Sequence, residues 1–267
     1  MKGRVLIIAG SDSGGGAGIQ ADIKAVSALN GYAATAITAL TAQNTKGVFA
    51  VHEAPPPFVV RQMELVLTDI GADCLKTGML ASVEIIEAVA GAIERFAPHV
   101  PLVVDPVMVA KGGAPLLAGD AAQALIARLV RRATVITPNI PEAEVLLGRA
   151  IPDLPAMEQA ARDLLGLGCK AVLLKGGHMA GDELVDLLAQ PGRLDAYAGR
   201  RIHTTSTHGT GCTLASSIAC GLAQGMTLED AVARGRAYVR KAIETAPGLG
   251  HGHGPLNHLH TVAEFQA

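Results

Sequence analysis

The sequence predicts one α/β domain in which a mostly parallel β-sheet lies between two layers of helices. Short apolar runs alternate with amphipathic stretches along most of the 267 residues, the order that βαβ units with right-handed crossovers produce. Hydrophobic residues make up 49% of the chain and aromatic ones only 3%, with 31 glycines, so the core must consist of small aliphatic side chains in closely packed layers. We find no repeat and no linker, and predict a single domain over residues 1–267.

The expected parallel strands are short runs that are apolar on both faces, as strands covered by helices on both sides require. They lie at residues 5–9, 34–40, 74–76, 102–105, 134–137 and 171–175. After Gly176 and Gly177 the pattern changes to short runs joined by polar turns. This change predicts a small antiparallel edge with strands at residues 184–188, 194–198 and 201–204.

The expected helices are amphipathic stretches between these strands, with two more at the end of the chain. In one of them, Met157, Ala160, Ala161 and Leu164 recur at the spacing of one helix face. The predicted helices cover residues 18–29, 57–67, 83–96, 121–130, 157–167, 213–224 and 228–245.

Composition argues against several classes of partner. The net charge is −2, without a basic or acidic run, and we expect neither a nucleic-acid nor a membrane partner. The first apolar run, 5–9, is ended by Gly10 and is too short for a signal peptide or a membrane span. The four cysteines form no CxxC pair, which favours reduced thiols and a cytoplasmic location.

Polar residues follow one strand after another in this sheet. Ligands of such sheets bind at the carboxyl ends of the strands, so these residues predict one site. They are the glycine-rich loop 10–18, Gln43, Gly78, Met79, Asp105, Asn139 and Lys175.

The loop at residues 10–18 is a glycine-rich turn between a strand and a helix, a place where backbone N–H groups bind phosphate. It lacks the Gly-Lys-Ser/Thr of a Walker A loop and the glycine spacing of a dinucleotide site. An equally good interpretation is a tight turn that brings the backbone close to a substrate or a neighbouring helix.

Residues 207–213, Thr-His-Gly-Thr-Gly-Cys-Thr, form the sharper motif. Glycines at a helix start let successive backbone N–H groups point inward, and with the helix N-terminus they form an anion hole for a transferring phosphoryl group. Cys212 lies in the first helical turn, where we expect a lowered thiol pKa and the ability to accept a proton from an attacking hydroxyl. The alternative is that Cys212 is only a small residue at a helix start.

Asn139 and Glu142 fit two interpretations that are compatible. The three-residue spacing at a helix start is typical of a capping arrangement. A carboxylate and an amide beside phosphates also suit Mg²⁺ that is held largely through water. Asp105 is a further candidate near the metal, and Lys175 supplies positive charge toward phosphates.

Two segments lie outside this site. Histidines at 251, 253, 258 and 260 alternate with glycine and proline and have no carboxylate or cysteine beside them, so we predict a surface segment over the last helix rather than a metal site. Paired glycines make the loop at residues 110–114 a candidate for movement.

The ordered set of motifs resembles one family. Segments 9–22, 38–45, 76–80, 105–108, 137–143, 175–178 and 209–212 are similar, in order, to those of the hydroxymethylpyrimidine/phosphomethylpyrimidine kinases of thiamine biosynthesis, which belong to the ribokinase superfamily. The motif at 209–212 resembles the Gly-x-Gly-Asp anion hole of that superfamily, with cysteine in place of aspartate.

The resemblance implies a ribokinase-like three-layer α/β/α sandwich, ATP with Mg²⁺ as cofactors, and a homodimer. It implies that Cys212 acts as the base within an anion hole of Gly209, Thr210 and Gly211. It places substrate at Gln43, Gly10, Asp22 and Met79, nucleotide phosphates at Lys175, Asn139, Asp105 and Thr207, and metal at Glu142 and Asp105.

The implied reaction is ATP-dependent phosphorylation of 4-amino-5-hydroxymethyl-2-methylpyrimidine, followed by phosphorylation of the monophosphate to the diphosphate. The second acceptor has no hydroxyl proton to lose near neutral pH, so Cys212 would there serve mainly as a hydrogen-bond donor. Two alternatives stay open. One is a pyridoxal or pyridoxine kinase, and the other is a pyrimidine-binding protein without catalysis, which the phosphate-side residues argue against.

Overall fold

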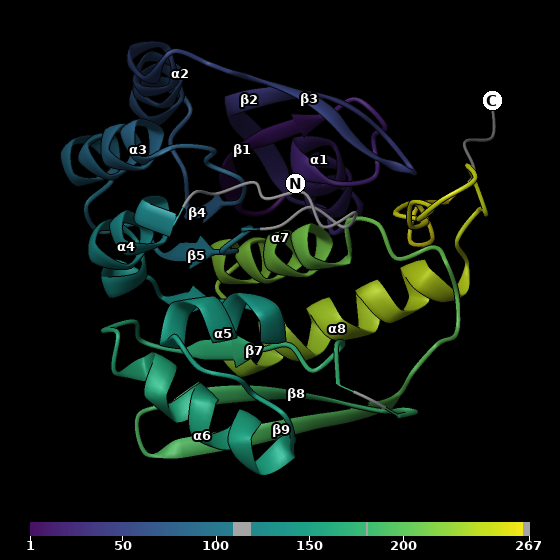
Figure 1. The fold of residues 1–267 in the computed structure, drawn as a ribbon. Helices are drawn as coiled ribbons and strands as arrows, with labels where there is room; N and C mark the ends of the chain where they lie inside the picture. Colours follow the sequence, from purple (N-terminus) through teal and green to yellow (C-terminus); the bar gives the residue numbers. More distant parts are fainter. Residues whose placement is uncertain (109–118, 180, 264–267) are drawn as a thin grey trace.

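A nine-stranded sheet forms the centre of the protein, with helices on both faces (Figure 1). The computed structural model describes residues 1–108, 119–179 and 181–263. The strand order is β3-β2-β1-β4-β5-β6-β7-β8-β9. The predicted flap at residues 110–114 lies outside the described residues. No helix of the described part is long and apolar enough to span a bilayer.

Six strands in the middle of the sheet are parallel, as predicted. Their order β2-β1-β4-β5-β6-β7 reverses direction beside β1, the kind of switch point at which open α/β sheets bind ligands. In chain order they are β1 (Arg4–Asp12), β2 (Tyr32–Asn44), β4 (Cys74–Thr77), β5 (Leu102–Val104), β6 (Val135–Ile136) and β7 (Val172–Leu174).

The two edges of the sheet are antiparallel. β8 (Glu183–Gln190) and β9 (Arg193–Arg200) form the predicted hairpin. β3 (Gly47–Glu53) on the opposite edge was not predicted, because it is mostly exposed and has no core face to create an apolar pattern. The strand predicted at residues 201–204 is wrong. Arg201 donates its guanidinium hydrogens to the carbonyls of Gly177, Met179 and Gly181 there, and no ladder forms.

Side chains of successive strand residues enter two separate cores. Leu6 and Ile8 of β1 pack into the first core, and Val5 and Ile7 into the second, as the two-residue period of a strand requires. The first lies under α2 (Pro56–Asp69), α3 (Val83–Phe96), α4 (Gly119–Arg128), α5 (Ile140–Leu147) and α6 (Leu154–Leu165). The second lies under α1 (Gly18–Ala28), α7 (Thr210–Ala223) and α8 (Leu228–Glu244).

The segment after α8 is bound to the rest of the molecule. The amide of His253 donates to the carbonyl of Thr45 at 2.8 Å, at the tip of the β2–β3 hairpin. His258 is buried, its Nε2 lies 2.9 Å from Thr213 Oγ1 in α7, and burial lowers its pKa to about 4. The segment is therefore more than the surface covering that was predicted. Among the described residues, no group of three or more His, Cys, Asp or Glu side chains is arranged to hold a metal.

Gly252→Ala should detach this segment from the hairpin. A Cβ at this position would collide with the carbonyl of Thr45, and overpacking of this kind costs about 1–3 kcal/mol. We expect a lower midpoint in thermal unfolding and faster proteolytic cleavage between residues 248 and 258. Gly91→Ala, in α3, is the control because a Cβ there meets nothing within 4 Å. Equal stability of the two variants would contradict the packing described here.

Candidate active site

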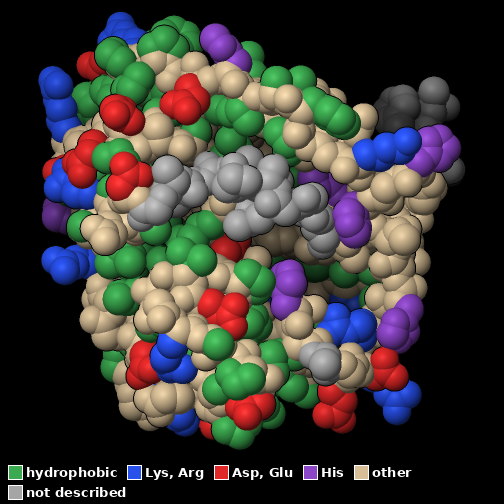
Figure 2. All heavy atoms as spheres, viewed as in Figure 1, with side chains coloured by type: hydrophobic (Ala, Val, Ile, Leu, Met, Phe, Trp, Pro, Cys, Tyr) green, Lys and Arg blue, Asp and Glu red, His purple; other side chains and the backbone are tan. Residues whose placement is uncertain are grey.

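A pocket of about 800 Å³ lies along the carboxyl ends of the parallel strands. It opens as a hollow on the face shown in Figure 2. Twelve of the thirteen predicted site residues line it: Gly10, Gln43, Met79, Asp105, Asn139, Glu142, Lys175, Thr207, Gly209, Thr210, Gly211 and Cys212. The structure thus brings together residues from most of the chain, as their positions at strand ends predicted.

The start of α7 forms the middle of the pocket. Gly209 is the N-cap, with φ of +83°, and a Cβ at this position would collide with the carbonyl oxygen of Gly16. Only glycine combines that backbone conformation with so close an approach to the first loop. A Cβ on Gly211 would lie 3.2 Å from Lys175 Nζ, so this glycine leaves the lysine room against the helix end. The first turn of α7 presents backbone N–H groups, which suit an anion.

Cys212 is the third residue of α7 and is partly exposed to the pocket. Burial raises the pKa of its thiol to about 12, and the carboxylates of Asp22 and Asp105 add to this rise, while Lys76 opposes it. The predicted lowering of this pKa is therefore wrong for the protein without bound ligands. The helix N-terminus does not compensate for lost hydration and two nearby carboxylates.

Asp105 and Lys175 form an ion pair beside the helix start. Lys175 Nζ lies 3.2 Å from Asp105 Oδ1, which also accepts a hydrogen bond from the Thr137 hydroxyl at 3.0 Å. Burial alone would lower the pKa of Lys175, but the carboxylates of Asp105 and Glu142 outweigh it and raise this pKa. Lys175 therefore stays protonated at neutral pH and points its charge into the pocket.

The capping arrangement predicted for Asn139 and Glu142 is confirmed, and their role beside a metal stays a prediction. Asn139 Oδ1 accepts from the Glu142 amide at 2.9 Å, and Glu142 Oε2 accepts from the Asn139 amide at 2.8 Å, which is a capping box at the start of α5. Glu142 is also buried in the pocket wall. Burial raises its pKa to about 7, Lys175 opposes the rise and Asp105 adds to it. Two carboxylates that share a buried site fit a divalent cation, because its charge would offset their repulsion.

Lys76 is a pocket residue to which the sequence assigned no role. It is fully buried at the end of β4, and its Nζ lies 2.8 Å from Asp22 Oδ2 and 3.0 Å from Asp22 Oδ1. Burial lowers the pKa of Lys76, but the Asp22 charge outweighs it and raises this pKa. The sequence does contain a signal for this ion pair, a lysine inside an apolar run, because a buried lysine needs a charged partner.

The same ion pair changes the expectation for Asp22. Its carboxylate is fully buried, does not line the pocket, and accepts a further hydrogen bond from the Ser216 hydroxyl at 2.6 Å. Lys76, which lines the pocket, holds this carboxylate in the ion pair. The contact between Asp22 and a substrate that the resemblance implied stays a prediction, and the structure shows Asp22 paired with Lys76.

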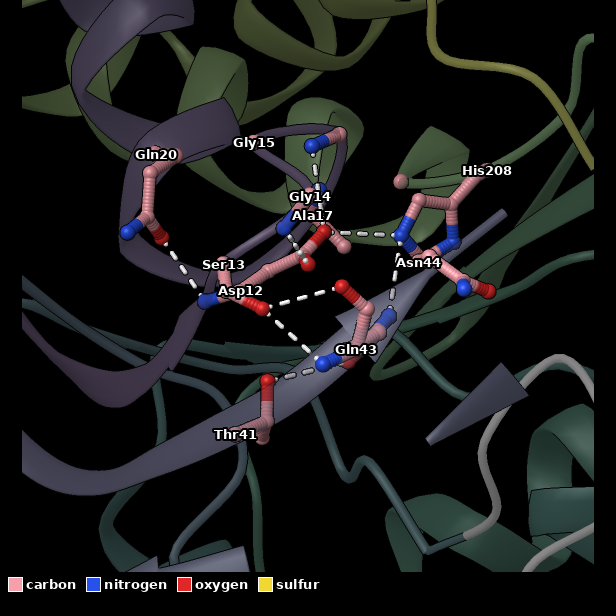
Figure 3. Close-up of polar contacts among 12 residues, drawn as sticks. Asp12, Ser13, Gly14, Gly15, Ala17, Gln20, Thr41, Gln43, Asn44 and His208 are labelled. Carbon is pink, nitrogen blue, oxygen red and sulfur yellow. Dashed lines mark hydrogen bonds and ion pairs between the residues drawn. The ribbon is translucent and has the colours of Figure 1, made fainter. Parts of the chain in front are cut away.

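A polar network joins the first loop to the segment before α7 (Figure 3). The carboxylate of Asp12 accepts hydrogen bonds from the amides of Gly14, Gly16 and Ala17 and from His208 Nε2 at 2.8 Å. Burial raises the pKa of Asp12, but these hydrogen bonds outweigh it and hold the pKa below its ordinary value. His208 Nε2 also lies 3.1 Å from the side-chain amide of Gln43. Neither Asp12 nor His208 was assigned a role from the sequence.

The fold and the pocket define a kinase of the ribokinase-like class, as the solved structures described below confirm. A family model described as phosphomethylpyrimidine kinase matches residues 12–257, and the chain belongs to this family. A hydroxymethylpyrimidine/phosphomethylpyrimidine kinase of Rhizobium meliloti is 47% identical over 263 residues, which are 97% of this chain and 98% of that protein.

Other relatives extend the comparison. A thiamine biosynthesis bifunctional protein of Geobacter sulfurreducens is 51% identical over 97% of this chain, which spans only 52% of that protein. A crystal structure of phosphomethylpyrimidine kinase from Clostridium difficile 630 superposes with a TM-score of 0.80 at 43% identity, over 91% of this chain and all of that one. Pyridoxal kinase from Staphylococcus aureus in complex with ADP has a TM-score of 0.89 at 33% identity, over 97% of this chain and 94% of that one.

Glu142→Gln should change the pH dependence of stability. The folded-state pKa of Glu142, about 7, lies above its ordinary value of 4.5, so wild-type stability falls as pH rises between these values. Glutamine keeps the capping box without the buried charge. In urea unfolding, the free energy of unfolding of the variant should rise relative to that of wild type between pH 5 and pH 7, and the difference should be constant above this range. The gain should be a few kcal/mol, at about 1.4 kcal/mol per pKa unit. A difference that does not vary with pH would contradict the raised pKa.

Proposed function

We propose that this protein transfers the γ-phosphoryl group of ATP to the hydroxymethyl group of 4-amino-5-hydroxymethyl-2-methylpyrimidine, and then phosphorylates the resulting monophosphate. One observation carries the proposal. One pocket is lined by the Gln43 amide, by the charged groups of Asp105, Glu142 and Lys175, and by the start of α7. Phosphoryl transfer depends mainly on such positioning and charge stabilisation.

The pyrimidine would bind between β1, β2 and the end of β4. Gln43 offers an amide edge that donates and accepts, which matches the ring nitrogen and amine of an aminopyrimidine. A Cβ on Gly10 would lie 3.3 Å from Met79 Sδ, so the backbone of this glycine and the thioether pack together in the pocket wall. A flat ring would pack against this wall, with its polar edge toward Gln43.

The phosphates would bind at the start of α7. The amides of Thr210, Gly211 and Cys212 would stabilise charge on the transferring group, and Lys175 would neutralise part of it. Asp105 and Glu142 fit Mg²⁺, with Asn139 beside them, and this ion would shield the charge of the nucleotide phosphates when bound.

The nucleoside would occupy the far end of the pocket. This end is lined by β9, the segment after it and α8. Arg236 and Arg240 of α8 lie here, and Arg236 is held by Asp186 at 2.8 Å. Thr207 lines the pocket between this end and the helix start, as a phosphate-binding role requires.

Cys212 would face the attacking oxygen. Its raised pKa means that the thiol carries a proton at neutral pH before ligands bind, which suits hydrogen-bond donation to a phosphate acceptor. To accept a proton from the alcohol, the sulfur must first lose its own. Lys76 and the amide of Gly18 lower the pKa of this thiol and so favour that form.

The substrate is tested by ADP release with ATP, Mg²⁺ and the pyrimidine alcohol, in parallel with pyridoxine and pyridoxal. We expect a higher kcat/KM for the pyrimidine. A higher value for pyridoxine or pyridoxal would favour the pyridoxal kinase alternative. Absence of ADP release with any of the three, together with retained pyrimidine binding, would favour a binding protein without catalysis.

We also propose a cytoplasmic homodimer. The exposed hairpin supports the dimer, because Leu40, Phe49 and Val51 expose 51%, 70% and 43% of their surface there, and β3 is an edge strand open to pairing. Sedimentation of wild type and of Phe49→Glu tests the dimer. Wild type should sediment with twice the mass of one chain, and the variant with the mass of one chain.

Cys212→Ala should reduce kcat/KM for the alcohol by about 10²–10⁴-fold, the usual contribution of a positioned proton acceptor. The affinity for the non-hydrolysable ATP analogue should stay close to wild type, because the amides of the helix start remain. We expect a smaller loss with the phosphate acceptor. Steady-state kinetics with both acceptors and calorimetric titration of the nucleotide measure these effects. Unchanged turnover of both acceptors would remove Cys212 from the mechanism.

A further inference from the structure

His208 contacts a carboxylate and an amide through the same ring nitrogen. Its Nε2 lies 2.8 Å from Asp12 Oδ2 and 3.1 Å from the end of the Gln43 side chain (Figure 3). The pKa of Asp12 is held low, so its carboxylate is ionised at neutral pH and can only accept. Nε2 of His208 must therefore carry a hydrogen. The end of the Gln43 amide that faces this nitrogen is favoured if it is the oxygen, because an amide N–H there would face another N–H.

The opposite end of the Gln43 amide meets a second constraint. Thr41 Oγ1 lies 3.0 Å from the carbonyl oxygen of Ser11 and 3.2 Å from the Gln43 side chain. A hydroxyl has one hydrogen, and the Ser11 carbonyl can only accept. With that hydrogen directed to Ser11, the hydroxyl oxygen is an acceptor toward Gln43 and requires a donor there.

Both constraints favour one orientation of the amide. If the amide nitrogen faces His208 and the oxygen faces Thr41, the N–H groups of Gln43 and His208 face each other. At the other end, Gln43 Oε1 and the Ser11 carbonyl compete for the one hydroxyl hydrogen of Thr41. Half a turn of the amide removes the contact between two donors: Oε1 then shares the one Nε2 hydrogen of His208 with Asp12, and the amide nitrogen donates to Thr41. The two ends of an amide have nearly the same shape, so hydrogen bonding decides between them.

We propose that His208, held by Asp12, and Thr41 fix the orientation of the Gln43 amide and thereby make the site select a 4-amino over a 4-oxo pyrimidine. The proposal rests on the function proposed above. It makes His208 a positioning residue that acts through Gln43.

The fixed orientation also explains which way the ring faces. The free lone pair of Oε1 lies on the His208 side and the free N–H of Nε2 on the Thr41 side. A ring whose N3 accepts from Nε2 and whose 4-amine donates to Oε1 carries its 5-hydroxymethyl group beyond the amine. The 5-hydroxymethyl group then lies on the His208 side of the ring, and His208 directly precedes Gly209, the N-cap of α7. In the 4-oxo ring, the hydrogen on N3 would face the N–H of Gln43 Nε2, and the carbonyl at position 4 would face Oε1. Both contacts would then be unfavourable.

The test compares dissociation constants, without ATP, for 4-amino-5-hydroxymethyl-2-methylpyrimidine and its 4-oxo analogue. We expect wild type to prefer the amine by about 100-fold or more, because a site built for one hydrogen-bond pattern rejects the reverse. In His208→Phe, which keeps ring volume without a nitrogen, the amide is free to turn and the preference should fall about tenfold. Thr41→Val releases the other end, and we expect the same direction of change.

Ser13→Ala is the matched control. The Ser13 hydroxyl is hydrogen-bonded to the backbone N–H and C=O of Gln43 at 2.9 Å each, without contact to its amide. Its loss should weaken both ligands equally and leave the ratio unchanged. If either folded variant, His208→Phe or Thr41→Val, keeps the wild-type ratio, the inference is overturned. If wild type itself binds neither pyrimidine, the proposed function fails instead.

Discussion

The approach of Gly209 to Gly16 is the constraint on which the site depends. No side chain fits between the two backbones, so the N-terminus of α7 is brought directly against the glycine-rich loop after β1. His208, just before this contact, lies beside Asp12, and Cys212, just after it, is close enough to Lys76 for their charges to interact. The loop thus holds the end of α7, and the loop glycines serve as close-packing positions whether or not they bind phosphate themselves.

Charge balance is the second feature that the pocket depends on. One fully buried lysine, one largely buried lysine and three buried carboxylates lie around the start of α7: Lys76, Lys175, Asp22, Asp105 and Glu142. Burying ions is unfavourable unless they are paired, and the pairs Lys76–Asp22 and Lys175–Asp105 meet that requirement. Glu142 is left with a raised pKa, so the unliganded pocket has more negative charge than it readily holds. A bound cation would remove that repulsion, and this links the stability of the pocket to its ligands.

Much of this arrangement could be predicted from the sequence, and the failures have local causes. The central strands were predictable because they are apolar on both faces, whereas β3 is exposed and has no such pattern. The site residues at strand ends were found because parallel strands align their ends. Lys76 and Asp22 are 54 positions apart, and nothing local to either shows that they pair. The pKa of Cys212 was predicted from the helix end alone, but burial, with a smaller contribution from carboxylates of α1 and the end of β5, raises this pKa instead.

The most direct test of this account compares Gly209→Ala with Gly225→Ala. Both glycines have φ of +83° and flank α7, but a Cβ on Gly209 meets the Gly16 carbonyl whereas one on Gly225 meets nothing within 4 Å. The backbone strain is therefore shared, and only the first variant disturbs the contact with the loop. We predict that Gly209→Ala lowers kcat/KM for the pyrimidine alcohol at least about 100-fold, as misplaced catalytic groups do, while Gly225→Ala loses only stability. Equal activity in the two folded variants would contradict the account.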